Sequence, residues 1–160
     1  MAKDINKNIK IIMGGIHPSV MYEQLLKNFP IACIIIGEGE ETIKELIPSL
    51  MSNKKLNNIK GIAFLKNKNV IRTEPRELIH NLDGLPFPSH ELFIETKRKK
   101  ICMLSSRGCP NMCSYCCLHL ISKRRYRTRS YQNIIKEIEE IIKKFPQIDT
   151  IEFSDDTLTL

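Results

Sequence analysis

Short apolar runs alternate with amphipathic stretches through the first half of the chain. Residues Lys10–Met13 form an apolar run that ends at a glycine pair, which predicts a buried strand followed by a tight turn. A second, β-branched run, Ile31–Ile36, lies between Pro30 and Gly37 and predicts a buried parallel strand. Because a helical pattern follows each run, the order indicates an α/β unit with a parallel sheet.

Two helices and a hairpin are predicted around these strands. Ser19 is a candidate N-cap for a helix that ends near Phe29. Apolar residues at helical spacing predict a second helix over Glu40–Met51. The segments Gly61–Leu65 and Val70–Thr73 are typical of a hairpin that turns at residues 66–69.

The pattern changes near Glu77. Pro86 and Pro88 follow, and each proline restricts the residue before it to an extended conformation. We therefore predict a stiff linker at residues 78–100, between a first domain of residues 1–77 and a second of residues 101–160.

The second domain repeats the α/β order. Ile101–Leu104 predicts a strand, and Ile148–Phe153 predicts the next one. Between them, Ser130 is a candidate N-cap for a helix to Phe145 with isoleucines along one face. The predicted unit is therefore strand, long loop, helix, strand.

Composition narrows the class of protein. The 160 residues are 42% hydrophobic and 27% charged, which is typical of a globular chain. The net charge of +7 reflects either a Lys-rich solvated surface or an acidic partner, and we favour the surface because the bases are spread along the chain. No apolar run is long enough for a membrane span or a signal peptide. We expect a cytoplasmic protein without a membrane or nucleic-acid partner.

Five of the six cysteines fall between Cys102 and Cys117. In a reducing compartment such clustering indicates a metal site before a disulfide. Cys109, Cys113 and Cys116 have the spacing C-x3-C-x2-C, and thiolates suit zinc or iron–sulfur. A closed zinc site needs four ligands, usually as two separated pairs, whereas three thiolates leave one iron of a cubane open.

This cysteine motif, with Tyr115 before its last cysteine, resembles the signature of the radical S-adenosylmethionine (radical SAM) family. The segments Ser105–Pro110, Tyr126–Ser130 and Phe153–Asp156 resemble the same family, so the resemblance extends over residues 101–160. It implies the start of a (β/α) TIM-type barrel. It also implies that the three cysteines hold a [4Fe–4S] cluster whose open iron chelates S-adenosylmethionine, which an electron cleaves to a 5′-deoxyadenosyl radical.

The resemblance also implies roles for residues beside the cysteines. Tyr115, Asp155 and Asp156 are expected to contact S-adenosylmethionine, the aspartates through its amino group. The family often has Gly-Gly-Glu where this chain has Ser-Asp-Asp, so helix N-capping by the aspartates stays an open alternative. No catalytic residue is expected beyond the cluster ligands. The expected partner is an electron donor such as flavodoxin or ferredoxin.

The first domain resembles the C-terminal half of the Rossmann/flavodoxin-like cobalamin-binding domain that precedes many radical SAM domains. The resemblance rests on Gly14-Gly15-Ile16-His17-Pro18 and on Gly37-Glu38-Gly39-Glu40. It implies that the four glycines line a pocket for the nucleotide tail of cobalamin: Gly14, Gly15, Gly37 and Gly39. The usual motif of the histidine cobalt ligand, Asp-x-His-x-x-Gly, is absent. The cofactor set is therefore a [4Fe–4S] cluster and S-adenosylmethionine, with cobalamin left open.

Two readings of function remain. In the first, the chain is a radical SAM enzyme fragment, with methyl transfer or rearrangement through cobalamin. In the second, it is a non-catalytic zinc or iron–sulfur module that recruits an acidic or nucleic-acid partner through Lys97–Lys100 and Lys123–Arg129, with His119 or Cys117 completing a zinc site. Because a (β/α)8 barrel takes about 250 residues, we expect a chain truncated at both ends and inactive alone.

Overall fold

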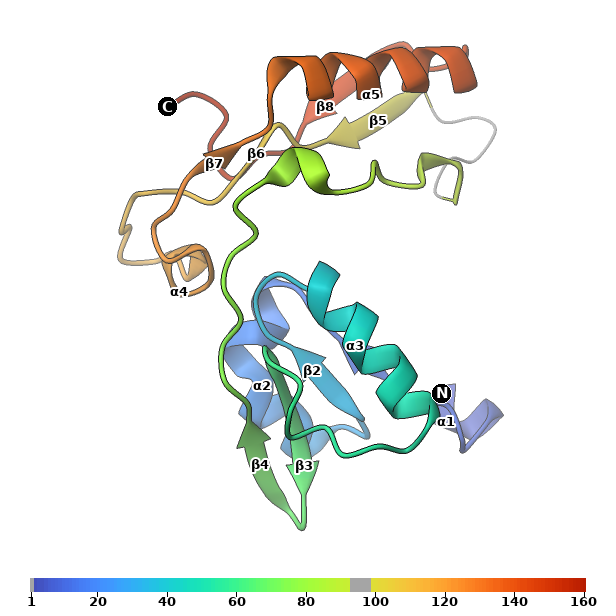
Figure 1. Cartoon of the computed structure of the whole chain (residues 1–160), viewed down its shortest axis with the longest axis vertical. Coiled ribbons are helices and arrows are strands. Elements are labelled where there is room, and N and C mark those ends of the chain that lie inside the picture. Colours follow the sequence, from blue (N-terminus) through green and yellow to red (C-terminus); the bar gives the residue numbers. More distant parts are fainter. Residues whose placement is uncertain (1, 93–98) are drawn as a thin grey trace. The chain divides into compact units, whose positions relative to one another are not determined.

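The computed structural model describes residues 2–92 and 99–160. The chain divides into two units, Met1–Leu78 and Ile79–Leu160, and Figure 1 shows the elements of each. The division falls close to the predicted domain boundary near Glu77. Each unit is an assembly of strands and helices, as the sequence predicts.

The first unit is built on a four-stranded sheet of order β1-β2-β3-β4. Its strands are β1 (Ile12–Met13), β2 (Cys33–Ile35), β3 (Ile62–Lys66) and β4 (Asn69–Arg72). β1 and β2 are parallel, with Ile12 opposite Cys33, and the β3–β4 hairpin continues the sheet in antiparallel fashion. Asn67 and Lys68 have positive φ angles of 51° and 66° at the tip, which is typical of a tight hairpin turn. The predicted α/β class and the hairpin are confirmed.

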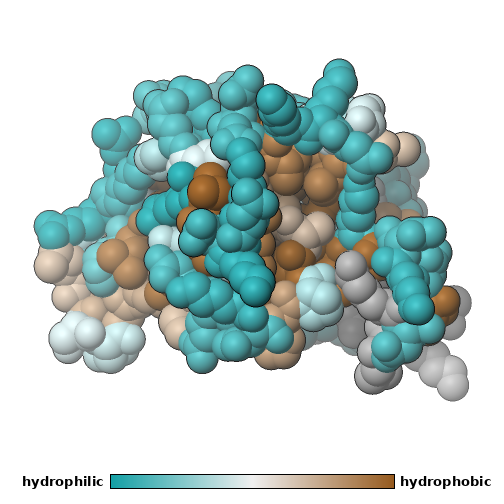
Figure 2. Space-filling model, turned by 90° about the horizontal axis from the view of Figure 1, so that it is seen from below, coloured by the Kyte–Doolittle hydropathy of each residue, from teal (hydrophilic) through white to brown (hydrophobic). Residues whose placement is uncertain are grey.

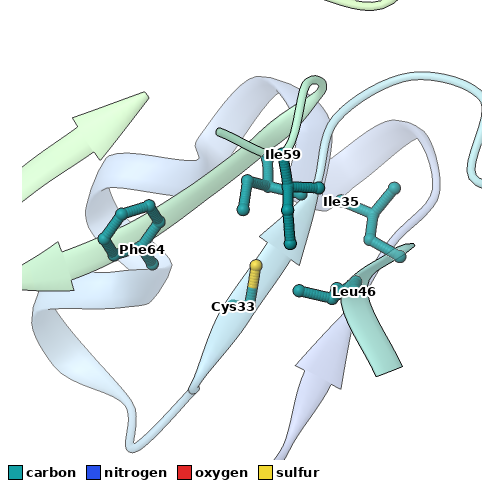
Figure 3. Packing of buried hydrophobic residues seen from close by; sticks show 6 residues of the cluster. Cys33, Ile35, Leu46, Ile59 and Phe64 are labelled. Carbon is teal, nitrogen blue, oxygen red and sulfur yellow. The ribbon is translucent and has the colours of Figure 1, made fainter. Parts of the chain in front are cut away.

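Helices cover both faces of this sheet. The unit's helices are α1 (Ala2–Ile5), α2 (Ile16–Asn28) and α3 (Glu40–Met51). Along β2, Ile34 packs in a cluster with Leu26 of α2, whereas Cys33 and Ile35 pack with Leu46 of α3. Since successive strand residues point to opposite faces, α2 and α3 lie on opposite sides of the sheet. Figure 3 shows the α3 side, where Cys33 and Ile35 pack against Leu46.

Ser19 is not the N-cap that the sequence predicts. Helix α2 begins four residues earlier than predicted, with Gly15 at the N-cap position and φ 95° there. The earlier start is possible because Pro18 lies in the first turn, where its missing N–H costs no hydrogen bond. Ser19 is instead buried, and its hydroxyl donates to the Gly15 carbonyl at 2.7 Å and accepts from the Gly37 N–H at 2.9 Å. It joins the two glycine turns that follow β1 and β2.

The second unit contains one parallel strand pair with a crossover helix. β5 (Lys100–Met103) pairs with β8 (Thr150–Phe153), and α5 (Tyr131–Lys144) lies between them in the chain. The Ser130 hydroxyl accepts from the Asn133 N–H at 3.2 Å, so the predicted N-cap is confirmed. The buried apolar side chains of this unit include Ile101 and Met103 of β5 and Ile141 of α5. This is the strand, loop, helix, strand unit expected at the start of a barrel.

The loop between β5 and α5 has structure of its own that the sequence does not predict. It contains β6 (Ser106–Arg107), the short helix α4 (Leu118–Ser122) and β7 (Arg127–Thr128). β6 and β7 pair in antiparallel fashion, with Ser106 opposite Thr128 and Arg107 opposite Arg127. Strands of two residues are too short to show an alternating pattern, so only the pairing defines them.

The segment predicted as a linker, residues 78–100, differs from a free linker over its described part. Residues 79–92, here termed the strap, contain the turns η1 (Leu82–Gly84) and η2 (His90–Leu92) and pack on the second unit. Leu82 is buried, and the Asp83 carboxylate accepts from the Ser130 N–H at 2.9 Å. Residues 93–98, the rest of the predicted linker except its last two residues, lie outside the described residues.

Hydrophilic residues occupy most of the face drawn in Figure 2, and hydrophobic surface shows between them. Among the described residues, no helix combines the length and the apolar character that a membrane span requires.

Candidate functional site

The three cysteines of the predicted metal motif lie on one loop. Two paired chain segments close the base of this loop, and we term this base the neck. The β6–β7 pair and a hydrogen bond from the Arg129 N–H to the Ser105 carbonyl, at 2.8 Å, bring the two ends of the loop together. We term residues 108–126 the cysteine loop; it contains Cys109, Cys113 and Cys116. The pairing means that all three thiols belong to one loop with a fixed base.

Gly108, at the first position of this loop, is required by close contact. Its φ is +87°, a conformation that side chains rarely adopt. A Cβ atom there would lie 2.2 Å from the Arg125 carbonyl oxygen and 3.0 Å from the Ser122 Cβ. The two ends of the loop therefore cross backbone to backbone at a distance that only glycine allows.

Two aspartates that follow β8 bind the base of the cysteine loop. Asp155 Oδ1 accepts from the Ser105 N–H at 3.0 Å and from the Ser105 hydroxyl at 2.9 Å, and the Ser106 hydroxyl donates to the same oxygen. Asp156 Oδ2 accepts from the Gly108 N–H at 3.0 Å. Neither aspartate caps a helix among the described residues. Their predicted contact with S-adenosylmethionine stays a prediction, and their observed partners are loop donors.

The thiols have different surroundings. Hydrogen bonds from the Thr157 hydroxyl and the Asn111 N–H hold the pKa of the Cys109 thiol below its ordinary value, which favours the thiolate that metals bind. The Cys116 N–H donates to the Cys113 carbonyl at 3.0 Å, so these two cysteines share one turn. Tyr115 is 91% exposed, and a hydrogen bond to Cys113 raises its pKa.

The donor set fits an iron–sulfur cluster by its chemistry. Three thiols on one loop, one of them with a lowered pKa, are soft ligands of the kind such clusters take. Within residues 2–92 and 99–160, no three His, Cys, Asp or Glu side chains converge closely enough to hold a single ion. Binding a cluster would therefore draw the three sulfurs of this loop together.

The other cysteines have different settings. Burial raises the pKa of the Cys33 thiol to about 12, so it stays protonated within the core, as expected. Cys102 is an exposed residue of β5, and Cys117 is the N-cap residue of α4.

A buried ionic cluster beside the loop was not predicted. Glu137 of α5 is only 1% exposed, and its carboxylate pairs with Arg129 Nη1 at 2.5 Å and His90 Nε2 at 2.9 Å. Arg129 also donates to the Leu104 carbonyl at 2.7 Å and lies over the Phe87 ring. The cluster joins the strap, α5 and the end of β5. One sequence signal could have revealed this cluster. Glu137 lies among the isoleucines on one face of α5, and a carboxylate buried on such a face needs a partner.

The strap closes a cavity of about 330 Å³ against the end of β5. Its walls are largely apolar, and they include Phe87, Leu104 and the Arg129–Glu137 pair. The cavity also borders Ser106 and Arg107, which precede the cysteine loop.

The four predicted glycines of the first unit fall into two kinds. Gly15 and Gly37 have positive φ angles of 95° and 79°, and nothing lies within 4 Å of a Cβ built on either. Gly14 and Gly39 pack against Ile35, at 3.7 Å and 3.4 Å from the nearest side-chain carbon. Both open turns border free space, and Ser19 links them. An exposed backbone at this sheet edge can accept a large ligand.

Replacing Asp155 tests its hold on the loop. We expect Asp155→Ala to lower the free energy of unfolding of the second unit by about 2 kcal/mol, because Ser105 and Ser106 lose a charged acceptor. Asp155→Asn should cost about half as much, since the amide oxygen still accepts. Urea unfolding followed by circular dichroism measures both values. The control is Glu140→Ala, a surface ion pair expected to change stability by less than about 0.5 kcal/mol. Equal effects of Asp155→Ala and Glu140→Ala would contradict the assignment.

Comparison with known proteins adds a second line of support. Residues 1–47 match the family model described as B12 binding domain. The whole chain is 36% identical over 166 residues to an uncharacterised methyltransferase of Pyrococcus horikoshii. It is also 34% identical, over 115 residues and 68% of its length, to the anaerobic magnesium-protoporphyrin IX monomethyl ester cyclase of Synechocystis sp.. The chain spans 36% and 23% of the length of these two relatives.

Among solved structures, the chain is similar to the cobalamin-dependent S-adenosylmethionine radical enzyme OxsB with aqua-cobalamin and S-adenosylmethionine bound. The TM-score is 0.73 at 26% identity, over 91% of this chain and 21% of that one. The similarity therefore spans both units of the chain. It also supports the fold predicted for both, a Rossmann-like domain followed by a radical SAM domain.

Proposed function

The chain belongs to the radical S-adenosylmethionine proteins that carry a cobalamin-binding domain, and on this premise we propose that it holds a [4Fe–4S] cluster on Cys109, Cys113 and Cys116. We propose further that S-adenosylmethionine binds beside this loop and that cobalamin binds at the glycine turns of the first unit. The parent activity is then a cobalamin-dependent radical reaction such as methyl transfer or rearrangement. The chain supplies one part of that enzyme.

The observation that carries the proposal is the anchored neck of the cysteine loop. Three soft donors lie on one loop, and its base is pinned by Asp155, Asp156 and the Gly108 crossing. A loop fixed at its base but exposed at Cys113 can close around a cluster while one side stays accessible to a small ligand. When bound, such a cluster supplies the single electron for cleaving the sulfonium bond of S-adenosylmethionine.

In this proposal the polar residues around the cysteine loop hold the loop in position and take no part in the reaction. Asp155 and Asp156 hold the segment after β8 against Ser105, Ser106 and Gly108, the residues just before the first cysteine. The Arg129–Glu137 pair fixes the end of β5, from which the loop starts. Residues held in place by packing and hydrogen bonds supply the orientation that cofactor chemistry requires.

Cobalamin binding is supported by the two open turns of the first unit. Gly15 and Gly37 present bare backbone to open space, and the Ser19 hydroxyl holds them in register. In OxsB, which the chain resembles, aqua-cobalamin is bound. We therefore assign the nucleotide tail of cobalamin to these turns.

Anaerobic reconstitution tests the cluster and its ligand. The chain should take up iron and sulfide, become brown, and show a reduced electron paramagnetic resonance signal that changes when S-adenosylmethionine is added. A colourless chain with one tightly bound zinc ion would instead support a non-catalytic zinc module.

Ser19→Ala tests the cobalamin turns. The variant loses both hydrogen bonds that join the turns, so we expect cobalamin affinity to fall about five-fold, which is about 1 kcal/mol. Titration with hydroxocobalamin, followed in the visible spectrum, measures the dissociation constant. Ser89→Ala, in the strap, is the control and should leave it unchanged. Unaltered affinity in Ser19→Ala would remove these turns from the site.

A further inference from the structure

The basic stretch at the end of the cysteine loop divides into two sets. Arg127 and Arg129 are engaged within the unit: Arg127 donates to a strap carbonyl at 2.6 Å, and Arg129 pairs with Glu137 at 2.5 Å. The other three cations are consecutive and exposed, and we term them the basic turn: Lys123, Arg124 and Arg125. One stretch of sequence therefore serves two purposes.

The basic turn presents its charge to solvent. Lys123 and Arg124 both have left-handed backbone conformations, with φ angles of 52° and 58°, which end α4 and reverse the chain. No ion pair joins any of the three side chains to another residue of the described ranges 2–92 and 99–160. By contrast, Lys99 and Lys100 of the other basic stretch pair with Asp149 and Glu152; the rest of that stretch, residues 97 and 98, lies outside the described residues.

The basic turn borders the predicted cluster ligands. Its Arg125 carbonyl lies against Gly108, which precedes Cys109 in the chain. At its other end, α4 joins it to Cys117, directly after Cys116. Met112 and Tyr115 in the same loop are 56% and 91% exposed. The surface around the thiols therefore combines three exposed cations with exposed apolar and aromatic groups.

We propose that the basic turn is the docking site of an acidic electron-carrier protein of the flavodoxin or ferredoxin type. The inference rests on the proposed function, in which the cluster must receive one electron. That electron leaves the reduced flavin or iron–sulfur centre of the carrier and enters the oxidised cluster; no bond forms or breaks and no proton moves. Exposed cations at the rim steer an acidic partner and raise its association rate, and the resulting complex is transient.

A protein partner fits this surface better than nucleic acid. Nucleic-acid affinity comes largely from neutralising several backbone phosphates at once, and this turn offers three cations. A brief electron-transfer encounter needs only a small interface.

Charge reversal tests the docking site. In the triple variant Lys123→Glu, Arg124→Glu, Arg125→Glu, we expect reduction of the reconstituted cluster by a reduced, acidic flavodoxin to slow about 30-fold at low salt. At about 0.3 M salt the difference should shrink to about three-fold, because exposed charges are screened. Stopped-flow absorbance measures the rate. The affinity of oxidised flavodoxin for the chain without iron, measured by calorimetry, should fall in parallel.

A matched control separates the effect of local charge on the reduction rate from the effect of net charge. Lys54, Lys55 and Lys68 are exposed, lie in the first unit, and Lys68 shares the left-handed conformation, with φ 66°. Their replacement by glutamate changes the net charge equally and should leave the flavodoxin rate within about two-fold. Equal slowing in both triple variants, or none in either, would overturn the docking site. So would loss of oligonucleotide binding in the basic-turn variant with an unchanged flavodoxin rate.

Reduction by dithionite distinguishes failure of the docking site from failure of the proposed function. This small reductant needs no docking, so it should reduce the cluster of the basic-turn variant as fast as that of the unchanged chain. If dithionite treatment of the unchanged chain shows no cluster to reduce, the proposed function is wrong and so is the docking site. If it reduces both chains and flavodoxin does not discriminate between them, only the docking site is wrong.

Discussion

Replacement of Cys109, Cys113 and Cys116 by serine is expected to abolish iron–sulfur binding. The reconstituted chain should fall from about four iron and four sulfide per chain to near zero, since serine offers no soft thiolate. The loop should stay folded, because its neck is held by backbone pairing and by Asp155 rather than by the thiols. Colorimetric iron and sulfide analysis, with the visible absorbance of the cluster, measures the loss.

The matched control for this variant uses the cysteines that the motif excludes. Cys102 is exposed on β5, and Cys117 is half-buried at the N-cap position of α4, so the double variant Cys102→Ser, Cys117→Ser removes two other thiols from the same unit. It should retain the full iron content. Retention of iron and sulfide by the triple variant would refute the ligand assignment, and loss in the double variant would extend the ligand set.

Gly108→Ala should have the largest effect on stability. The positive φ of 87° costs a side chain about 1–3 kcal/mol. The added methyl would also lie 2.2 Å from the Arg125 carbonyl oxygen, and overpacking of this kind adds about 1–3 kcal/mol. We expect a loss of about 4 kcal/mol in the unfolding free energy of the second unit, together with poor retention of the cluster. Urea unfolding and iron analysis measure the two effects.

Gly84→Ala is the control for this substitution. A Cβ at Gly84 would lie 3.6 Å from the Asn81 side chain, an ordinary contact, and its backbone has no positive φ. It should change stability by less than about 1 kcal/mol. A Gly108→Ala chain as stable as Gly84→Ala would show that the neck does not close as described.

These experiments address three properties of the same loop. We expect the cysteines to decide whether a cluster binds, Gly108 to decide whether the loop can close, and the basic turn to decide which protein reductant docks. Because the three sets of residues do not overlap, a failure in one experiment identifies the step that fails.

Helices and strands with a strong local pattern were predicted well. Glu40–Met51 has the predicted bounds, and Ser130 caps α5 as expected. Both features depend on residues within one or two helical turns, so the sequence contains the whole signal. Ser19 shows the limit of such reasoning, because a preference for N-caps cannot reveal that Gly37, eighteen residues away, would bind its hydroxyl.

On the α5 stripe, periodicity places the isoleucines and Glu137 together. The structure buries Ile141 and Glu137, whereas Ile135 and Ile142 are 49% and 59% exposed. Glu137 is buried because Arg129 pairs with its carboxylate and His90 lies within hydrogen-bond distance of it, and both approach from other segments. Burial of a charge depends on its partners, and the pattern of one helix does not contain them.

By itself, the sequence determined the α/β class, the cysteine motif and the glycine turns, because each is a property of neighbouring residues. Only the tertiary structure decided what the polar residues do. It turned Asp155 and Asp156 toward the loop base, made the strap part of the second unit, and divided one basic stretch into two arginines engaged within the unit and an exposed turn. These outcomes rest on contacts between residues up to 50 positions apart. Such contacts depend on how the chain folds back on itself, which local spacing does not encode.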